Sequence, residues 1–341
     1  MSTQTLDLTR LDPWLRQYIP AFDGPLVAEK FAGGQSNPTF KLTAGENQYV
    51  LRRKPPGELL ASAHAVDREY RVIAALYETD VPVPRPIVLS DDESIIGSMF
   101  YVMEYLDGRI FWDPTLPEVD DTERAAIFDE MNRVMAALHS VDVEAVGLAD
   151  YGKPGNYFER QVGRWSKQYR ASETESIPAM EQLMAWLPDN MPEDDGRVAL
   201  VHGDYRLDNV MFHPTEPRII AVLDWELSTL GNPIADLAYQ VMAWQFPREG
   251  GIAGLAGVDR QSLNIPDDAS YIAQYCARTG RDGIEHWNFY MAFCFFRIAA
   301  ILQGVKKRAL QGNASSTEAA TRPDQVGPLA ELGVAYMNAS N

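Results

Sequence analysis

The segment LVHGDYRLDNVMFHPTEPRIIAVLDWELSTLGNPIADLAY, residues 200–239, decides the fold. It contains His-Gly-Asp ending at Asp204, an asparagine five residues later at Asn209, two β-rich runs, and then Leu-Asp-Trp around Asp224. Transfer of a phosphoryl group to an alcohol needs a carboxylate near the hydroxyl proton and oxygen ligands for magnesium on the phosphates. Asp204 and Asn209 can project from one tight loop, and Asp224 adds a hard oxygen after the next strand pair. The ordered set, rather than any single feature, therefore predicts this chemistry.

The same segment resembles the catalytic and metal-binding loops of the protein kinase superfamily, and most of all the aminoglycoside phosphotransferase and choline kinase branch. That branch has His-Gly-Asp where protein kinases have His-Arg-Asp, and Asp-Trp-Glu where they have Asp-Phe-Gly. The resemblance implies that Asp204 is the catalytic base and that Asn209 and Asp224 hold Mg²⁺. It also implies that His202 ties the loop to neighbouring backbone, and that Asp236 braces the loop through backbone hydrogen bonds.

A glycine-rich turn in the first lobe adds independent support. In FAGGQSNPTFKL, the residues Gly33, Gly34, Ser36 and Asn37 lie between two predicted strands. Backbone N–H groups of such a turn can approach phosphate oxygens closely. The turn is not a Walker A loop, because it lacks Gly-Lys-Ser/Thr. Taken alone it reads as an ordinary hairpin turn, whereas its place before a strand ending in YVLR resembles the nucleotide-covering loop of the kinase fold.

The strand that follows this turn offers a cation for the phosphates. YVLR resembles the Val-Ala-Ile-Lys pattern of the kinase superfamily, with Arg52 in the lysine position. An arginine can contact phosphate, even through two nitrogens at once. Arg53 and Lys54 remain alternatives for this role.

The helix predicted next carries Glu69, which resembles the glutamate that pairs with that cation. A local pair with Arg68 or Arg71 on an exposed helix surface is the alternative. The helical spacing within HAVDREYRVIAALYET predicts an apolar stripe formed by Val66, Tyr70, Ile73 and Tyr77.

The segment FYVMEYLDG, residues 100–108, resembles the kinase hinge. The resemblance implies that Met103 lies behind the adenine. It also implies that the C=O of Glu104 and the N–H of Leu106 bind the edge of the base.

The order of predicted elements gives the fold class. Three short strands, one helix and two further strands around the acidic turn DDES precede Gly108. Asp120 to Glu123 can form a capping box for a long helix whose apolar face contains Ile127, Met131, Val134 and Leu138. Helical patterns follow at 157–171, 176–187 and 234–310, with a β-rich island at 198–223. We therefore predict an α+β, bilobal, protein-kinase-like fold: a nucleotide-binding lobe at 1–103 with an antiparallel sheet and one helix, a hinge at 104–108, and a mainly helical catalytic and substrate-binding lobe at 109–341.

Composition excludes some classes of function. A net charge of −18 over 341 residues argues against nucleic acid as a partner. The most apolar stretch, 287–302, is short for a membrane span and is interrupted by Arg297, so we expect a buried helix and no membrane association. Two widely spaced cysteines and the absence of a signal-peptide pattern lead us to expect a cytoplasmic protein. The oligomeric state is left open.

The acceptor is not named by these motifs. No activation segment separates Asp224 from Asp236, which favours a small-molecule hydroxyl acceptor over a protein. GGQSNPTFKL, VLRRKPPGELL and HGDYRLDNVMF together resemble the kinase-like domains associated with acyl-CoA dehydrogenases, which implies a hydroxyacyl acceptor, while a cationic alcohol stays open. Acidic residues beside Asp204 would favour the cation, and apolar ones such as Trp165 or Trp244 would favour an acyl or aromatic acceptor.

The resemblance implies ATP (or GTP) and Mg²⁺ as cofactors. Because Arg52 replaces the usual lysine, an ATP-binding pseudokinase or regulatory partner of an acyl-CoA dehydrogenase system is the alternative.

Overall fold

The chain divides into two units in a computed structural model that describes residues 6–19, 22–31, 37–55, 65–248, 253–311 and 324–339. Unit 1 contains Met1–Arg109 and Met211–Leu227, and unit 2 contains Ile110–Val210 and Ser228–Asn341. The sequence-based boundary at 104–108 does not include the return of Met211–Leu227 to the first unit. Backbone hydrogen bonds explain this return, because Arg109 and Phe212 exchange two of 2.8 Å and Val222 N–H donates to Pro82 C=O.

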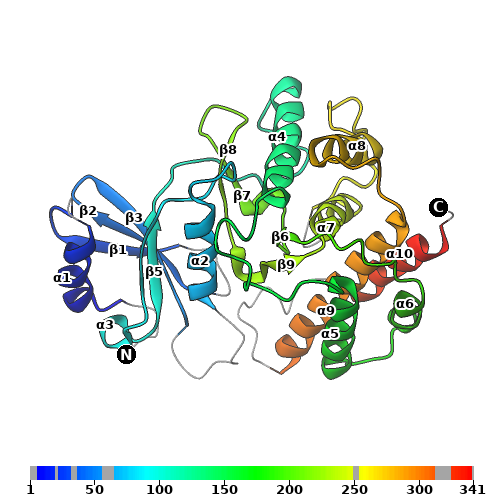
Figure 1. The fold of residues 1–341 in the computed structure, drawn as a ribbon, viewed down its shortest axis with the longest axis horizontal. Helices are drawn as coiled ribbons and strands as arrows, with labels where there is room; N and C mark the ends of the chain where they lie inside the picture. Colours follow the sequence, from blue (N-terminus) through cyan, green and yellow to red (C-terminus); the bar gives the residue numbers. More distant parts are fainter. Residues whose placement is uncertain are drawn as a thin grey trace. The chain divides into compact units, whose positions relative to one another are not determined.

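A five-stranded antiparallel sheet forms the centre of unit 1, in the order β1-β2-β3-β5-β4 (Figure 1). The first three strands are neighbours in the sheet, in agreement with the predicted antiparallel sheet, and β5 then pairs with β3 and leaves β4 at the edge. Burial alternates along β2, so that Phe40, Leu42 and Ala44 face the core. The strands are β1 Leu26–Lys30, β2 Thr39–Ala44, β3 Asn47–Arg53, β4 Pro86–Ser90 and β5 Phe100–Glu104.

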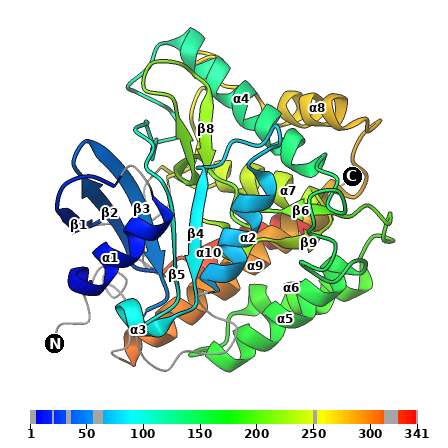
Figure 2. The same cartoon turned by 60° about the vertical axis from the view of Figure 1, so that its left-hand side comes forward.

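Helices cover both faces of this sheet. One face packs against α1 (Leu8–Tyr18) and the short α3 (Glu93–Ile96), which join a cluster with Phe40 and Leu42. The other face packs against α2 (Val66–Leu76), which contacts β4 and β5 (Figure 2). The prediction of one helix in this lobe was therefore incomplete. Asp7 and Asp92 accept hydrogen bonds from backbone N–H groups at the starts of α1 and α3, and this capping was not recognised in the sequence.

The buried face of α2 also differs from the predicted stripe. Val66 and Ile73 are buried, but Tyr77 is 41% exposed and Tyr70 is only partly buried. The helix instead buries Val66, Glu69, Val72, Ile73 and Leu76. A carboxylate on an apolar face does not enter a hydrophobic pattern, so the sequence alone pointed to a face rotated away from the real one.

A hairpin and a short 3₁₀ turn complete unit 1. β7 (Val210–Phe212) pairs with β8 (Ile219–Val222), and η2 (Trp225–Leu227) follows and packs against α2. The hairpin expected between Asn209 and Asp224 is thus present. It delivers Asp224 to the same unit as Arg52.

Unit 2 is mainly helical and is built around α9 (Trp287–Leu310). The buried helix expected at 287–302 is confirmed, and α5, α6, α7 and α10 pack against it (Figures 1 and 2). By length and composition α9 could cross a membrane, but 78% of its apolar window is buried inside the protein, as in a core helix. The remaining helices are α4 Asp121–His139, α5 Tyr157–Ser172, α6 Pro178–Asp189, α7 Ile234–Trp244, α8 Asp268–Thr279 and α10 Val326–Asn338.

Two predicted features of α4 are confirmed, its N-terminal cap and its apolar face. The side chain of Asp120 accepts a 2.8 Å hydrogen bond from Glu123 N–H at the start of α4, and Ile127, Met131, Val134 and Leu138 are all buried. A two-stranded antiparallel sheet joins β6 (Ala199–Val201) to β9 (Thr229–Gly231). The end of β6 and the start of α7 then carry the residues of the candidate site.

Candidate active site

Residues 202–209, called the HGD loop here, are fixed by one buried carboxylate. Asp236, in the first turn of α7, accepts hydrogen bonds from the backbone N–H groups of His202 (2.6 Å) and Gly203 (2.8 Å). The imidazole Nδ1 of His202 accepts a 3.2 Å hydrogen bond from Asp204 N–H. Because Asp236 and His202 are fully buried, these bonds are shielded from water and define the backbone path of the loop.

A second layer of side chains orients Asp236. The Nε2 atom of His139, at the end of α4, lies 3.2 Å from Asp236 Oδ2, and its Nδ1 lies 2.7 Å from the hydroxyl of Tyr275. Burial on its own raises the pKa of the Asp236 carboxyl, but His139, His202 and the Gly203 N–H together hold it below its ordinary value. Asp236 is therefore an anion that the interior stabilises. His139 was not predicted, because it is 97 residues from Asp236 and belongs to no motif.

The Asp204 carboxylate is positioned within this loop and remains partly exposed. The Nδ2 atom of Asn209 donates to Asp204 Oδ2 (3.0 Å) and to the Asp204 backbone C=O (2.8 Å). Arg206 Nε lies 3.1 Å from Asp204 Oδ1, and its NH2 group lies 3.0 Å from Asp208. Arg206 was not predicted, since an arginine two residues after an aspartate carries no specific sequence signal.

The Tyr239 hydroxyl is a further neighbour of this carboxylate. Burial, and then the Asp204 carboxylate, raise the pKa of Tyr239 far above its ordinary value. Tyr239 therefore stays protonated and can donate a hydrogen bond to Asp204.

Arg297 on α9 supports the HGD loop from the core. It is 4% exposed, and its NH2 group donates a 2.6 Å hydrogen bond to Gly203 C=O. Its guanidinium lies 4.9 Å from the ring centre of Tyr239 and 5.7 Å from that of Trp165. Burial alone lowers the pKa of Arg297, but neighbouring groups, Tyr157 first among them, raise it above the ordinary value, so the charge persists. An arginine within the apolar run WNFYMAFCFFRIAAIL was the available signal, because a buried cation needs partners.

Unit 1 holds a second charged cluster, centred on Arg52. Its Nε lies 2.7 Å from Glu69 Oε2, and its NH2 group lies 2.6 Å from Asp224 Oδ1. Burial alone lowers the pKa of Arg52, but Glu69 and the other acidic groups raise it well above its ordinary value. Glu226 lies 4.0 Å away and was not predicted, although it belongs to the Asp-Trp-Glu motif.

Side chains alternate between the two faces of β3, and this distinguishes the three cations that the sequence left as alternatives for contact with phosphate. Arg53, on the opposite face from Arg52, donates to Ile96 C=O and lies over the ring of Phe40. Lys54 follows the strand, and its backbone N–H bonds to Met99 C=O. Of the three, Arg52 is the side chain that meets Glu69 and Asp224.

Glu69, on α2, is surrounded by polar partners from other parts of unit 1. It is 1% exposed and accepts hydrogen bonds from Asn37 Nδ2 (2.7 Å) and the Tyr101 hydroxyl (3.2 Å). The alternative of an exposed Glu69 paired with Arg68 or Arg71 is therefore wrong. The predicted turn residues Gly33, Gly34 and Ser36 lie outside the described residues. Tyr101 was missed, because an aromatic residue in a strand reads as core.

Asp224 sits where the backbone changes direction after β8. Its φ is +62°, a left-handed conformation that is uncommon for residues other than glycine. The next side chain, Trp225, is 1% exposed and donates a 3.0 Å hydrogen bond to Val222 C=O, which anchors the turn. The turn leaves the Asp224 side chain 35% exposed, so part of the carboxylate faces solvent as well as Arg52.

The predicted hinge residues lie at the end of β5 and just beyond it. Met103 is buried beside β4, and Glu104 N–H donates a 2.9 Å hydrogen bond to Arg85 C=O. Glu104 and Leu106 are partly buried. Their proposed contacts with an adenine base remain a prediction.

Each unit, taken by itself, offers a side-chain oxygen of the kind that magnesium binds. Asp224 offers carboxylate oxygen, and Asn209 offers its amide oxygen because its Nδ2 is engaged with Asp204. Across the described ranges, no group of three or more His, Cys, Asp or Glu side chains forms a ready-made metal cage. Mg²⁺ is commonly held by one or two carboxylates together with substrate phosphates.

The tryptophans that could have indicated the acceptor are core residues. Trp165 and Trp244 are each 5% exposed, and Trp244 packs edge-on against Phe128 and Tyr271. Among the described residues, the side chains of Arg206, Asn209 and Tyr239 lie against the Asp204 carboxylate, and Arg206 also pairs with Asp208 of the same loop.

Several known proteins are similar to this chain in sequence. The sequence model described as "Phosphotransferase enzyme family" matches residues 27–286. The chain is 50% identical over 310 residues to acyl-CoA dehydrogenase family member 10 of Mus musculus, covering 91% of the chain and 29% of that protein. It is 43% identical over 333 residues to family member 11 of Homo sapiens, covering 96% of the chain and 43% of that protein. The chain thus spans less than half the length of these relatives.

Solved structures are similar to this chain in fold. A Ralstonia eutropha JMP134 protein described as "a putative aminoglycoside phosphotransferase" is 53% identical, with a TM-score of 0.90 and coverage of 99% of this chain and 100% of that one. A mutant of aminoglycoside phosphotransferase APH(4)-Ia, in complex with ADP and hygromycin B, is 15% identical, with a TM-score of 0.61 and coverage of 97% and 99%. This second likeness shows the kinase-like fold alone. The chain belongs to the phosphotransferase enzyme family and is related to the acyl-CoA dehydrogenase family members 10 and 11.

Proposed function

We propose that the chain transfers the γ-phosphate of ATP, or of GTP, to a hydroxyl group of a small molecule. The observation that carries this proposal is the HGD loop, in which a partly exposed carboxylate at Asp204 is held by Asn209 and Arg206. The loop itself is fixed by buried Asp236. Such pre-positioning is what general base catalysis requires.

In the proposed reaction, Asp204 accepts the proton of the acceptor hydroxyl. The hydroxyl oxygen forms a bond to the γ-phosphorus, and the bond from that phosphorus to the β–γ bridging oxygen breaks. The electron pair of the broken bond leaves with the nucleoside diphosphate. Asn209 and Arg206 hold the carboxylate in place, and a protonated Tyr239 can donate to it.

The Arg52 cluster is proposed to hold the nucleotide. Glu69 orients the guanidinium of Arg52, which supplies positive charge to the phosphates in the role of the usual lysine. Asn37, the last residue of the predicted glycine-rich turn, belongs to the same hydrogen-bonded group. The backbone around Glu104 and Leu106, with Met103 behind it, is proposed to receive the base.

Asp224 and Asn209 are the proposed magnesium ligands. When bound with the nucleotide, Mg²⁺ neutralises negative charge on the phosphates. Asp224 would then exchange part of its contact with Arg52 for contact with the ion, which its 35% exposure permits.

The acceptor class is the finer part of the proposal. The relatives named acyl-CoA dehydrogenase family members 10 and 11 favour a hydroxyacyl compound. The charged side chain that contacts Asp204 directly is Arg206, a cation, and this does not favour a cationic alcohol.

The test is release of ADP from Mg-ATP across a panel of hydroxyl compounds, including hydroxyacyl-CoAs, aminoglycosides, choline, homoserine and sugars. We expect a hydroxyacyl compound to be phosphorylated, and Asp204→Asn to lose about 10²- to 10⁴-fold in turnover while ATP still binds. Retained turnover in this variant would exclude Asp204 as the base. Binding of ATP without turnover of any compound would favour the pseudokinase or regulatory alternative.

A further inference from the structure

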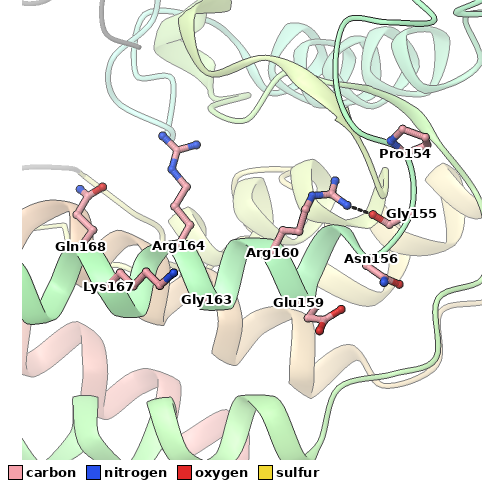
Figure 3. A pocket seen from close by; sticks show the side chains of 9 residues that line it. All are labelled: Pro154, Gly155, Asn156, Glu159, Arg160, Gly163, Arg164, Lys167 and Gln168. Atoms are coloured by element: carbon pink, nitrogen blue, oxygen red, sulfur yellow. Dashed lines mark hydrogen bonds between the residues drawn. The ribbon is translucent and has the colours of Figure 1, made fainter. Parts of the chain in front are cut away.

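A basic pocket lies along the outer, solvent-exposed face of α5. Its volume is about 980 Å³, and Figure 3 shows the side chains of Arg160, Arg164 and Gln168 projecting from the same side of the helix. Residues 160, 164 and 168 share one face because they are one helical turn apart. The lining residues are Pro154, Gly155, Asn156, Glu159, Arg160, Gly163, Arg164, Lys167 and Gln168.

The charge of this pocket opposes that of the whole protein. Three of the lining residues are cations and one, Glu159, is an anion, in a chain whose net charge is −18. Arg160 is held by the carbonyl groups of Gly155 and Lys153. No ion pair ties Arg164 or Lys167 to a carboxylate in the part of the chain that the structure describes.

Like charges at these spacings repel one another on a helix. Arg160 and Arg164 are four residues apart, and Arg164 and Lys167 are three apart. The arrangement therefore lacks the compensation found elsewhere on this helix, where Arg170 pairs with Glu181. An anion from outside the chain would relieve the repulsion.

A fourth cation reaches this face from α9. An added Cβ at Gly304 would lie 3.7 Å from both the NH1 atom of Arg308 and the Nε2 atom of Gln168, so these two side chains are close together. Arg308 is exposed. The positive face therefore extends beyond α5 to a second helix.

The same helix connects the pocket to the HGD loop. Trp165, next to Arg164 in the chain, points inward to the guanidinium of Arg297, which donates to Gly203 C=O. The outer face of α5 presents cations while its inner face supports the loop that carries Asp204. A ligand on the outer face would thus lie on a helix that helps to shape the candidate active site.

We propose that this pocket binds the phosphate-bearing part of the acceptor, so that the acceptor is a polyanion rather than a cation. Arginine and lysine are the side chains that recognise phosphate. A volume near 980 Å³ is at the upper end for small-molecule sites and far exceeds the needs of one phosphate ion, so a carrier with several phosphate groups fits better. This inference rests on the proposed function for its link to turnover, but not for the binding of the anion.

Binding can be tested without catalysis, with inorganic tripolyphosphate as the probe and isothermal titration calorimetry at low salt. The double variant Arg164→Gln/Lys167→Gln should bind about tenfold more weakly, and added salt should weaken wild-type binding. The control Arg133→Gln/Arg197→Gln removes the same charge from exposed positions that already have carboxylate partners. Equal loss of tripolyphosphate affinity in both double variants, or no loss in either, would overturn the proposed site. This result does not depend on whether the chain is an active enzyme.

Kinetics then distinguish an acceptor from a free effector. For a hydroxy compound offered with and without a phosphate-bearing carrier, Arg164→Gln/Lys167→Gln should raise the KM about tenfold only for the carrier-linked form. The kcat and the KM for ATP should not change. A variant that loses tripolyphosphate binding but keeps the KM for the carrier-linked acceptor would overturn the acceptor assignment, since the anion would then be a free effector.

Discussion

Asp236 shows how one residue can organise a functional loop without reaching its reacting atoms. Its two oxygens receive the N–H groups of His202 and Gly203, and His139 lies against the same carboxylate. Taking a carboxylate out of water is costly, and these donors offset the cost only while it is ionised. Its protonation state is therefore linked to stability.

Replacing Asp236 with asparagine should lower the free energy of unfolding at pH 7 by about 2 to 4 kcal/mol, because the amide nitrogen cannot accept a hydrogen bond from the loop. The pKa of Asp236 is lowered in the folded protein, so its stabilisation is present above the unfolded-state value of about 3.9 and is lost as the pH falls through the lower folded value. The difference in stability between wild type and variant should therefore shrink below about pH 4.

Urea unfolding at several pH values between 7 and 3 measures this difference. Asp259→Asn, at an exposed position, serves as the control and should change stability by less than about 1 kcal/mol. A gap between wild type and Asp236→Asn that stays constant down to pH 3 would contradict the linkage.

At the scale of elements, unit 2 depends on close contact between α9 and α10. Gly333 of α10 lies where an added Cβ would be 3.0 Å from Leu183 Cδ1 on α6 and 3.1 Å from Phe295 Cβ on α9. Gly327, in the first turn of the same helix, has no such neighbour within 4 Å. Gly333 lets α10 approach α6 and α9 closely, whereas packing does not require a glycine at position 327.

Gly333→Ala should therefore be less stable than Gly327→Ala by about 1 to 3 kcal/mol, the usual cost of overpacking. Helix propensity favours alanine at both positions, by up to about 1 kcal/mol, so comparison of the two variants cancels much of this term. Urea or thermal unfolding of the two proteins gives the difference directly. Equal stability would mean that Leu183 and Phe295 move aside without cost.

At the scale of the molecule, the proposed nucleotide and metal residues are divided between two units. Arg52, Glu69 and Asp224 belong to unit 1, and Asp204 and Asn209 belong to unit 2. A ligand that binds only the folded protein raises its stability in proportion to the logarithm of its concentration over Kd. Nucleotide and metal can therefore be followed by stability as well as by turnover.

A non-hydrolysable ATP analogue with Mg²⁺, at one hundred times its Kd, should stabilise the protein by about 2.7 kcal/mol and raise Tm by roughly 4 °C. Removal of the metal with EDTA should abolish most of this shift, and Asp224→Asn should do the same. Asp204→Asn is the matched control and should keep the shift. Differential scanning fluorimetry measures all four cases, and a shift that does not change with EDTA would exclude metal-dependent binding.

Much of the fold could be predicted because its signals are local. The strands, the hairpin after Asn209, the cap at Asp120 and the apolar helix at 287–302 each follow from a short run of residues. Helices α1 and α3 were missed, since each rests on one capping aspartate that also fits a turn. The face of α2 was misjudged because its buried position 69 is a glutamate.

The sequence by itself determined the kinase-like fold, the HGD loop and the identity of the carboxylates and amide that fit phosphoryl transfer. Only the tertiary structure decided which of Arg52, Arg53 and Lys54 meets Glu69, and it alone brought in Arg206, Tyr239, His139 and Arg297. The physical reason is the distance along the chain over which each effect acts. Turn chemistry and hydrophobic periodicity act over a few residues, whereas a buried charge is satisfied by whatever group the fold brings to it, from anywhere in the chain.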